Sequence, residues 1–467
     1  MNRQVNICRR WHWSFSLFIA LLVVTLCFGA CTREKTDASD LISTVPSSAG
    51  GVVGINVTSI LEKAGYKVEN GVITPPKKVN LDLSSLSERD RSLMELFFSG
   101  ETGIDPAGAI LFYDSNRTYV TFGLSDTGKF RDFVEKRNGK SFSESNGVAI
   151  CGDVAMKGAQ AWVTFSDRPI DYDVIIGYSS LVPSQSFLNN PYGEQFRAMD
   201  HDFIGWSKMK IITKNFLDFQ QTTMFNLFSS SLFEDADEVI FDADFLKGKF
   251  ECELKVLNGK GKPAKYLLPA DKVNVATIKT IGENADVVFA ATVSPKLFNK
   301  LEKLGSTISG DSYKNFTEMV KNIDGTIAVG CSNLEGAFDE NLSGVITTDG
   351  KPSLVLKGAV STIAPMRMDG DLIRFSRGKM DGALKVDRCA DMLKGASLGI
   401  VSDFPAYPIS ELSNLPVIGN SFATDIFELY CLRIVPDDGS IELEMIIEAK
   451  DKSENIIKTV LSQSSGK

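Results

Sequence analysis

Histidine and tryptophan are scarce in this sequence of 467 residues, which holds 2 histidines and 4 tryptophans. His201 is the single histidine beyond the first 30 residues, so a site built on two histidines is excluded from the rest of the chain. The 50 lysines and arginines are outnumbered by 59 aspartates and glutamates, which gives a net charge of −9. An acidic chain is poorly suited to binding nucleic acid through its phosphates. We therefore expect no nucleic-acid partner and no enzyme that depends on several histidines.

The first 30 residues have the pattern of a secretion signal. Three arginines and no acidic residue precede an apolar run over 16–28, which is short for a membrane-spanning helix. The run leads into Phe-Gly-Ala-Cys at 28–31, which resembles the lipobox of bacterial lipoproteins, where the cysteine is lipidated and becomes the new N-terminus. We predict a lipoprotein signal peptide over 1–30 and lipidation, including palmitate, at Cys31. An uncleaved membrane anchor or a plain secretory signal is the alternative.

The segment after the predicted cleavage site is polar and rich in small residues, and we interpret 31–48 as a tether between membrane and folded domain. Without 1–30 the chain keeps 47 basic residues against its 59 acidic ones, a net charge of −12. This balance disfavours attraction to an anionic membrane. We therefore expect the N-terminal lipid to hold the protein to the membrane, as an outer-membrane lipoprotein of the cell envelope. The side of that membrane it faces stays open.

Beyond residue 48 the sequence alternates between hairpin patterns and single helices. A β-branched run at 51–57 precedes a short helical pattern at 59–65. Apolar runs at 109–113 and 119–124 flank an Asp-Ser-Asn-Arg turn, and 126–137 carries apolar residues on one helical face. Hairpins mixed with single helices predict an α+β fold with antiparallel sheets.

The chain also has the pattern of a degenerate internal repeat. Residues 52–65 and 287–305 both read as a strand followed by a helix that ends in Leu-Glu-Lys-x-Gly. We predict two similar α+β halves, 49–266 and 267–467. A basic, polar loop with glycine and proline lies at their boundary.

Short motifs spread over most of the chain are similar to those of a known family. They are Pro46, Val53, Asn56, Lys63-Ala64-Gly65, Leu268-Pro269 and Asp451-x-x-Glu454-Asn455. In these the chain resembles Bacteroidota lipoproteins that carry domain of unknown function 4836. The resemblance implies a cell-envelope lipoprotein without an established activity, and it transfers no catalytic residues.

The cysteines beyond Cys31 are scattered and never occur in Cys-x-x-Cys spacing, which argues against a zinc site or a redox motif. Most of them lie in apolar, strand-like segments, where a free cysteine behaves as a small hydrophobic residue. We expect buried thiols, with one disulfide as the alternative. The residues concerned are Cys151, Cys252, Cys331, Cys389 and Cys431.

An acidic hairpin is the most distinctive constellation in the sequence. Pairing 239–245 with 250–256 around Lys247-Gly248 places apolar residues opposite one another on one face. The other face then holds four carboxylates in two facing pairs, Asp242 with Glu253 and Asp244 with Glu251. Like charges in this arrangement need solvent, a cation or a basic partner. We favour a solvated face relieved by neighbouring lysines, and keep a cation or partner patch as the speculative alternative.

Asp200-His201-Asp202 could form a metal ligand set or a catalytic base. Adjacent side chains diverge on a strand or a helix, so the three converge poorly on one ion. We favour a solvated loop or the start of a strand.

Gly395-Ala396-Ser397-Leu398-Gly399 matches the nucleophile-elbow pattern of hydrolases. The elbow needs a strand before the serine and a helix after it. The sequence here indicates the reverse, and no histidine follows to act as the base. We therefore assign no catalytic residue, metal or cofactor. The prediction is a non-catalytic binding or scaffold module for an unidentified envelope protein or glycan. A carboxylate-dependent, glycosidase-like hydrolase is the alternative, because such an enzyme needs two acids and no histidine.

Overall fold

The fold is that of a computed structural model, which describes residues 41–69, 72–74, 102–164, 170–211, 233–266, 271–293, 321–332, 341–403 and 426–464. The predicted signal peptide, the lipidation site Cys31 and the first part of the tether lie outside these residues. The sequence also predicts helices near 81–99 and 215–228 from the spacing of their apolar residues, and these lie outside the described residues as well.

Antiparallel strands dominate the described chain. Eighteen of them join into a single sheet, and two further pairs, β2 with β3 and β13 with β19, stand apart. The strands up to residue 258 are β1 (Gly51–Ile55), β2 (Lys67–Glu69), β3 (Val72–Thr74), β4 (Ile104–Asp114), β5 (Arg117–Leu124), β6 (Ser143–Ser145), β7 (Val148–Cys151), β8 (Val154–Lys157), β9 (Gln160–Thr164), β10 (Phe203–Lys208), β11 (Ala236–Leu246) and β12 (Lys249–Asn258). The later strands are β13 (Asn284–Ala285), β14 (Val287–Val293), β15 (Ile323–Cys331), β16 (Leu342–Thr348), β17 (Met366–Asp369), β18 (Leu372–Arg377), β19 (Leu384–Lys385), β20 (Leu398–Asp403), β21 (Phe427–Asp437) and β22 (Ser440–Ala449).

Short helices pack against this sheet. They are η1 (Ile42–Thr44), α3 (Val57–Lys63), α5 (Thr127–Asn138), α6 (Tyr172–Tyr178), η3 (Pro183–Gln185), η4 (Phe187–Asn189), α7 (Gly193–Ala198), α10 (Val275–Ile278), η5 (Lys279–Ile281), α13 (Leu354–Ile363), α14 (Val386–Met392) and α16 (Ile456–Ser464). Among the described residues no helix has the length and apolar character needed to cross a membrane. The α+β class with antiparallel sheets is as the sequence predicts.

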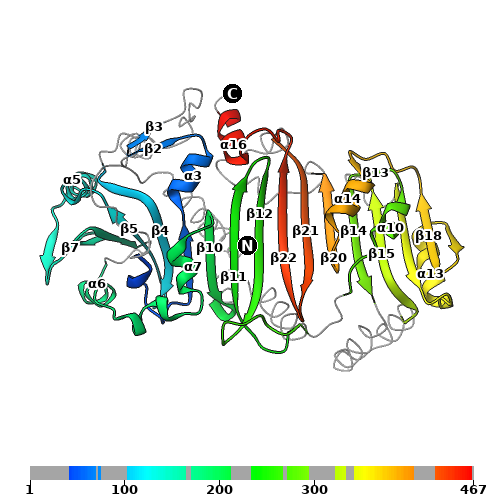
Figure 1. The fold of residues 1–467 in the computed structure, drawn as a ribbon, viewed down its shortest axis with the longest axis horizontal. Coiled ribbons are helices and arrows are strands. Elements are labelled where there is room, and N and C mark those ends of the chain that lie inside the picture. The colour runs from blue at the N-terminus through cyan, green and yellow to red at the C-terminus, as the bar shows by residue number, and fades with distance from the viewer. Residues whose placement is uncertain are drawn as a thin grey trace, which may run out of the picture.

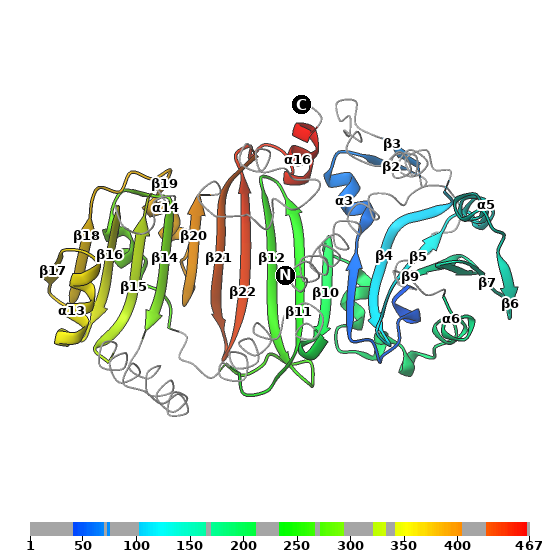
Figure 2. The same cartoon turned by 180° about the vertical axis from the view of Figure 1, so that it is seen from behind.

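The order of strands across the large sheet follows from their pairings. It runs β6-β7-β8-β9-β5-β4-β1-β10-β11-β12-β22-β21-β20-β14-β15-β16-β18-β17. Figure 1 shows the middle of this order from left to right, from β10 to β15. In the first part β1 lies between β4 and β10, and in the second part β14 lies between β15 and β20. The central pair is β12 with β22, so strands from distant parts of the chain join the two parts. The sheet ends at β6 and at β17 (Figure 2).

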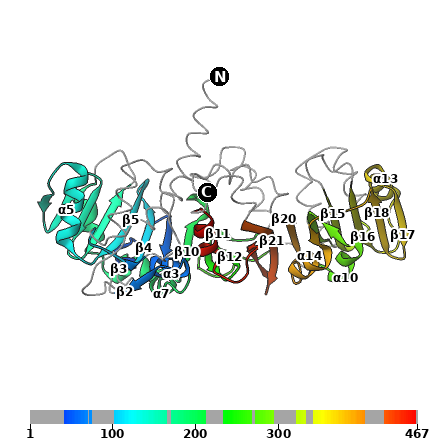
Figure 3. The same ribbon diagram turned by 90° about the horizontal axis from the view of Figure 1, so that it is seen from above.

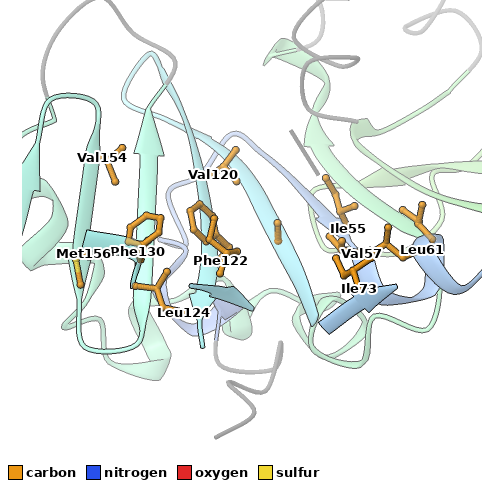
Figure 4. Packing of buried hydrophobic residues seen from close by; sticks show 14 of the residues in the cluster. Ile55, Val57, Leu61, Ile73, Val120, Phe122, Leu124, Phe130, Val154 and Met156 are labelled. Atoms are coloured by element: carbon orange, nitrogen blue, oxygen red, sulfur yellow. The ribbon is translucent and has the colours of Figure 1, made fainter. Parts of the chain in front are cut away.

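Local sequence signals explain the first hairpin. Ser115 and Asn116 both adopt positive φ, the backbone that a tight two-residue turn between β4 and β5 requires. Asp126 then caps α5 by accepting a hydrogen bond from the backbone N–H of Lys129. Figure 4 shows the core that results, where Phe122 of the hairpin packs beside Phe130 of α5. The predicted strand, hairpin and helix of this region are confirmed.

The second part of the sheet is covered on both sides. Alternate residues of β14 point to opposite faces. Val288 packs with α10 and α14, whereas Val287 packs with α13. In Figure 3, α10 and α14 accordingly lie on one side of the sheet and α13 on the other.

The prediction of a tether over 31–48 is wrong for residues 41–48. Leu41, Ile42 and Val45 are between 0% and 2% exposed and belong to a core that includes Trp162 and Trp206. The backbone N–H of Phe187 donates to the carbonyl of Val45, which fastens this segment to η4. Residues 41–48 are therefore part of the folded domain, because three apolar side chains among polar neighbours suffice to bury the segment.

Candidate functional site

A polar cluster forms where the start of β10, the end of β11 and helix α3 meet near the centre of the sheet. We call it the Asp202 cluster, and it consists of Asn56, Ser59, Lys63, His201, Asp202 and Asp244. Its parts come from three separate stretches of the chain, 56–63, 201–202 and 244.

Asp202 is the buried centre of the cluster, with 0% of its side chain exposed. Its Oδ2 accepts from Nζ of Lys63 at 2.7 Å and from the backbone N–H of Phe245 at 2.7 Å. Its Oδ1 accepts from the hydroxyl of Ser59 at 2.6 Å. A buried carboxylate requires such partners, because an unpaired charge away from water is strongly destabilising. Asp202 therefore connects α3 to the end of β11.

Helix α3 is built to meet Asp202. Asn56 caps its N-terminus by accepting from the backbone N–H of Ser59, and its own amide donates to the carbonyl of Met199. Ser59 and Lys63 are four residues apart and so lie on the same helical face. Met199 adopts φ 45°, a left-handed backbone that turns the chain out of α7 toward His201 and Asp202.

His201 lies at the solvent side of the cluster, with 41% of its side chain exposed. Its Nδ1 is 2.6 Å from Oδ2 of Asp244 and 4.0 Å from Oδ1 of Asp242. Burial opposes protonation of the ring, but the hydrogen bond to Asp244 and the charges of Asp242, Asp244 and Asp200 outweigh it. The pKa of His201 is therefore raised above its ordinary value. The predicted solvated loop is right in part: the ring is half-exposed, yet it is held by the acidic hairpin.

Asp242 and Asp244 occupy the same face of β11 but differ in their proton affinity. Burial raises the pKa of Asp242, and the nearby His201 offsets only part of the rise. Burial acts on Asp244 too, but the hydrogen bonds from His201, the backbone N–H of Asp202 and Lys63 lower its pKa. Asp244 is thus an ionised carboxylate that contacts both Lys63 and His201.

The acidic hairpin has the predicted register, with Asp242 opposite Glu253 and Asp244 opposite Glu251. Side chains near each pair supply positive charge. Lys249 is 2.5 Å from Glu251, and Lys255 is 2.7 Å from Glu253. Among the described residues, no group of three or more acidic, histidine or cysteine side chains is arranged to hold a metal ion. The four carboxylates therefore form a network with lysines and histidine.

The charged face continues beyond the hairpin into the second part of the sheet. Lys255 also contacts Glu442 of β22 at 2.9 Å, and Arg433 of β21 contacts Glu444 at 2.6 Å. Arg433 also donates to the carbonyl of Met392 at the end of α14. Charged side chains thus occupy each strand from β11 to β21, and ion pairs join β12 to β22 and β22 to β21.

The other residues considered in the sequence have structural surroundings. Ser397 lies between α14 and β20, the reverse of an elbow, and its hydroxyl donates to the carbonyl of Ile434 at 3.3 Å. The five described cysteines are all free thiols, four of them buried and Cys252 partly so, which confirms the buried-thiol prediction apart from Cys252. Trp162 and Trp206 are 0% and 2% exposed, so neither can stack on a sugar.

Sequence reasoning missed the α3 half of the cluster. Ser59 and Asp202 are 143 positions apart, and no local pattern links them. One signal was available: Asn56 is a helix-capping residue type directly after a buried strand, followed by Ser59 and Lys63 on one helical face. That pattern marks the end of a strand as a place where polar groups gather.

Comparisons with known proteins add little. No family model matches the chain, and no curated protein matches it. Three solved structures of TP0453, its crystal forms I, III and IV, share 9–10% identity with the chain. They cover 75–76% of this chain and 96–98% of their own, with TM-scores of 0.28–0.30. A likeness at this level supports no inference about function.

Proposed function

We propose that the chain is a cell-envelope lipoprotein, held at the outer membrane through a lipid on Cys31. The proposal rests on the N-terminal sequence, where three arginines are followed by an apolar run that ends in Phe-Gly-Ala-Cys at 28–31. Two or more acyl chains anchor a protein stably, where one does not. Metabolic labelling with palmitate should mark the wild type and fail to mark Cys31→Ala. Equal labelling of both would contradict the proposal.

We propose further that the folded domain is a non-catalytic binding or scaffold module. The support is the way the charged face from β11 to β21 is used: Glu253 bonds to Lys255 and Arg433 bonds to Glu444, so these side chains pair within the face rather than converge on an open position. Such a face is suited to contact with a polar partner, an envelope protein or a glycan.

A photo-reactive residue placed at Glu253, which is 35% exposed, tests this in cells. It should give a discrete cross-linked product with an envelope component. The same residue at Val182, which is 51% exposed and outside the charged face, should not. Identical products from both positions, or none from Glu253, would contradict a binding role for this face.

We also propose that the chain consists of two similar α+β halves. The order β5-β4-β1-β10-β11-β12 in the first part corresponds to β16-β15-β14-β20-β21-β22 in the second. The two orders meet at β12 and β22, which pair antiparallel, as a two-fold relation between the halves requires. We propose as well that the chain is related to the lipoproteins that carry domain of unknown function 4836. An experimental structure in which the two sets of strands do not superpose would refute the repeat.

A carboxylate-dependent hydrolase is the second candidate, and one observation favours it. Asp242 and Asp244 lie two residues apart on one face of β11, about 7 Å from each other along the strand. Their pKa values are shifted in opposite directions, as an acid and a base require. Against this, both oxygens of Asp244 already bond to Lys63, His201 and the backbone of Asp202. Hydrolysis of envelope glycans that is lost in Asp242→Asn and kept in Glu253→Gln would favour the hydrolase over the binding module.

A further inference from the structure

Large apolar side chains that are well exposed gather in one region of the molecule. Among the described residues seven such side chains are 38% exposed or more: Val182, Phe289, Leu354, Val355, Ile363, Met368 and Leu398. Three of them belong to α13, and Met368 belongs to the neighbouring strand β17. Leu354 is 86% exposed, the highest value of the group.

The pairing of strands places Phe289, Met368 and Leu398 on the same side of the sheet as α13. Met368 is opposite Ile373, which packs under α13. Phe289 is directly opposite Val329 of β15, which packs against that core. Leu398 is opposite Ala291 of β14, and Ala291 is opposite Ile327, which also packs against it. Residues directly opposite each other in a sheet point to the same face. Six of the seven exposed apolar side chains therefore share one side of the second part of the sheet.

Helix α13 has an unusual composition for a helix with an open face. Of its ten residues only Lys357 is charged. Leu356 and Val360 are buried against the sheet, whereas Leu354, Val355 and Gly358 point away from it. Ser361 and Thr362 are exposed as well, and their hydroxyls donate to the carbonyls of Lys357 and Ala359 within the helix. The exposed part of α13 thus combines large apolar side chains with small polar ones. Single exposed apolar residues need no explanation, but several on one side of one part of a sheet, three of them on one helix, mark an interaction site.

Charge indicates the partner. Lys351 precedes α13 and Lys357 lies on it, and the stretch 351–368 contains no acidic residue, although the whole chain is acidic. Arg367 does not add to this charge, because it alternates with Met366 and Met368 along β17 and so points to the other side of the sheet. Apolar side chains on a short helix with lysine nearby are a combination by which proteins lie in the interface of anionic bilayers. A second copy of this chain that used the same surface would bring Lys351 and Lys357 against the same two lysines, so an anionic surface fits better.

We propose that α13, with Met368 beside it, is a membrane-contact surface that lies in the headgroup region of an anionic lipid bilayer. Leu354, Val355 and Ile363 enter the apolar boundary, and Lys351 and Lys357 face the phosphates. The contact adds to the lipid anchor of the proposed function and does not depend on it. It would hold the second part of the sheet at the membrane, as the N-terminal lipid would hold the first.

Hydrogen exchange of the full chain, followed by mass spectrometry, tests the proposal. The readout is local, so association of the N-terminal apolar segment with lipid does not confuse it. Vesicles of phosphatidylglycerol should slow exchange of the 354–363 amides several-fold, and vesicles of phosphatidylcholine should slow it less. The Cys31→Ala chain should give the same result, so failure of the anchor and failure of this surface can be told apart.

Matched variants complete the test. Leu354→Glu combined with Val355→Glu should abolish the protection of α13, whereas Val182→Glu should leave it unchanged. Exchange in β15 should be the same in all chains, which confirms that they are folded. Protection that survives the double substitution, or that never appears on vesicles, overturns the proposal. Protection without lipid that rises with protein concentration also overturns it, because it identifies a second copy as the partner.

Discussion

The Asp202 cluster predicts a specific loss of stability when its buried charge is removed. Asp202→Asn keeps the shape of the side chain but removes the charge that faces Lys63, Ser59 and the backbone of Phe245. Removing one partner of a buried ion pair costs about 3–5 kcal/mol. Lys63 is 27% exposed, so water can solvate its ammonium group, and Asp244 stays within 3.3 Å. We therefore expect a loss near the lower end, about 3 kcal/mol.

Urea unfolding followed by tryptophan fluorescence measures this loss. Beyond residue 30 the tryptophans are Trp162 and Trp206, both buried in the same part of the sheet as the cluster. With a slope of about 3 kcal/mol per M, the midpoint should fall by roughly 1 M. Lys63→Met should also destabilise, because Asp202 would keep its charge without a cation. The two changes together should cost less than their sum by about 1–2 kcal/mol.

Lys265→Met is the matched control. Lys265 and its partner Glu234 are 67% and 55% exposed, so the unfolding midpoint should not move. A wild-type midpoint in Asp202→Asn would refute the view that the cluster joins α3 to the sheet. Strict additivity of Lys63→Met and Asp202→Asn would refute the direct pairing of these two residues.

Three further predictions concern a histidine, a thiol and two glycines. The pKa of His201 is raised above 6.5 beside Asp244, so the stability that the protonated ring adds to the fold is fully present below pH 6.5 and is lost as pH rises through the higher folded value. The difference in urea midpoint between wild type and His201→Gln should therefore become smaller as pH rises. A constant difference would contradict the pairing. Burial raises the pKa of Cys389 to about 12, so iodoacetamide should label it only after unfolding, as peptide mass spectrometry can show; rapid labelling of the native chain would be the opposite result. A Cβ at Gly382 would lie 2.0 Å from backbone of β13, whereas one at Gly358 meets nothing within 4 Å. Thermal unfolding followed by circular dichroism should therefore show Gly382→Ala strongly destabilised and Gly358→Ala stabilised by about 0.5–1 kcal/mol, and equal effects would contradict the packing.

The acidic hairpin shows what a sequence pattern can determine. Apolar and charged residues alternate with a period of two over both strands, and a shift by one residue would bury Asp242 and expose Phe241. Only one register avoids that penalty, and the observed pairing is the expected one. Helix caps and two-residue turns are equally local, which is why β4, β5 and α5 could be predicted.

The Asp202 cluster shows what such patterns leave out. The partners that give Asp202 and His201 their roles come from α3 and β11. Those contacts depend on how strands distant in sequence are ordered in the sheet, which no local periodicity encodes. Residues 41–48 were misread for a similar reason: three apolar side chains are too few to show a period.

The centre of the large sheet cannot form before β22 has been synthesised, because β22 pairs with β12 there. Until residues 440–449 have been made, β12 is an edge strand whose outer backbone groups lack partners. Such an edge is a template for pairing with other chains, and the alternating Phe250, Cys252 and Leu254 would add an apolar face to it. Contacts between positions almost 200 residues apart also form slowly. A chain shortened before β22 should therefore be prone to aggregation, although every strand of its first part is intact.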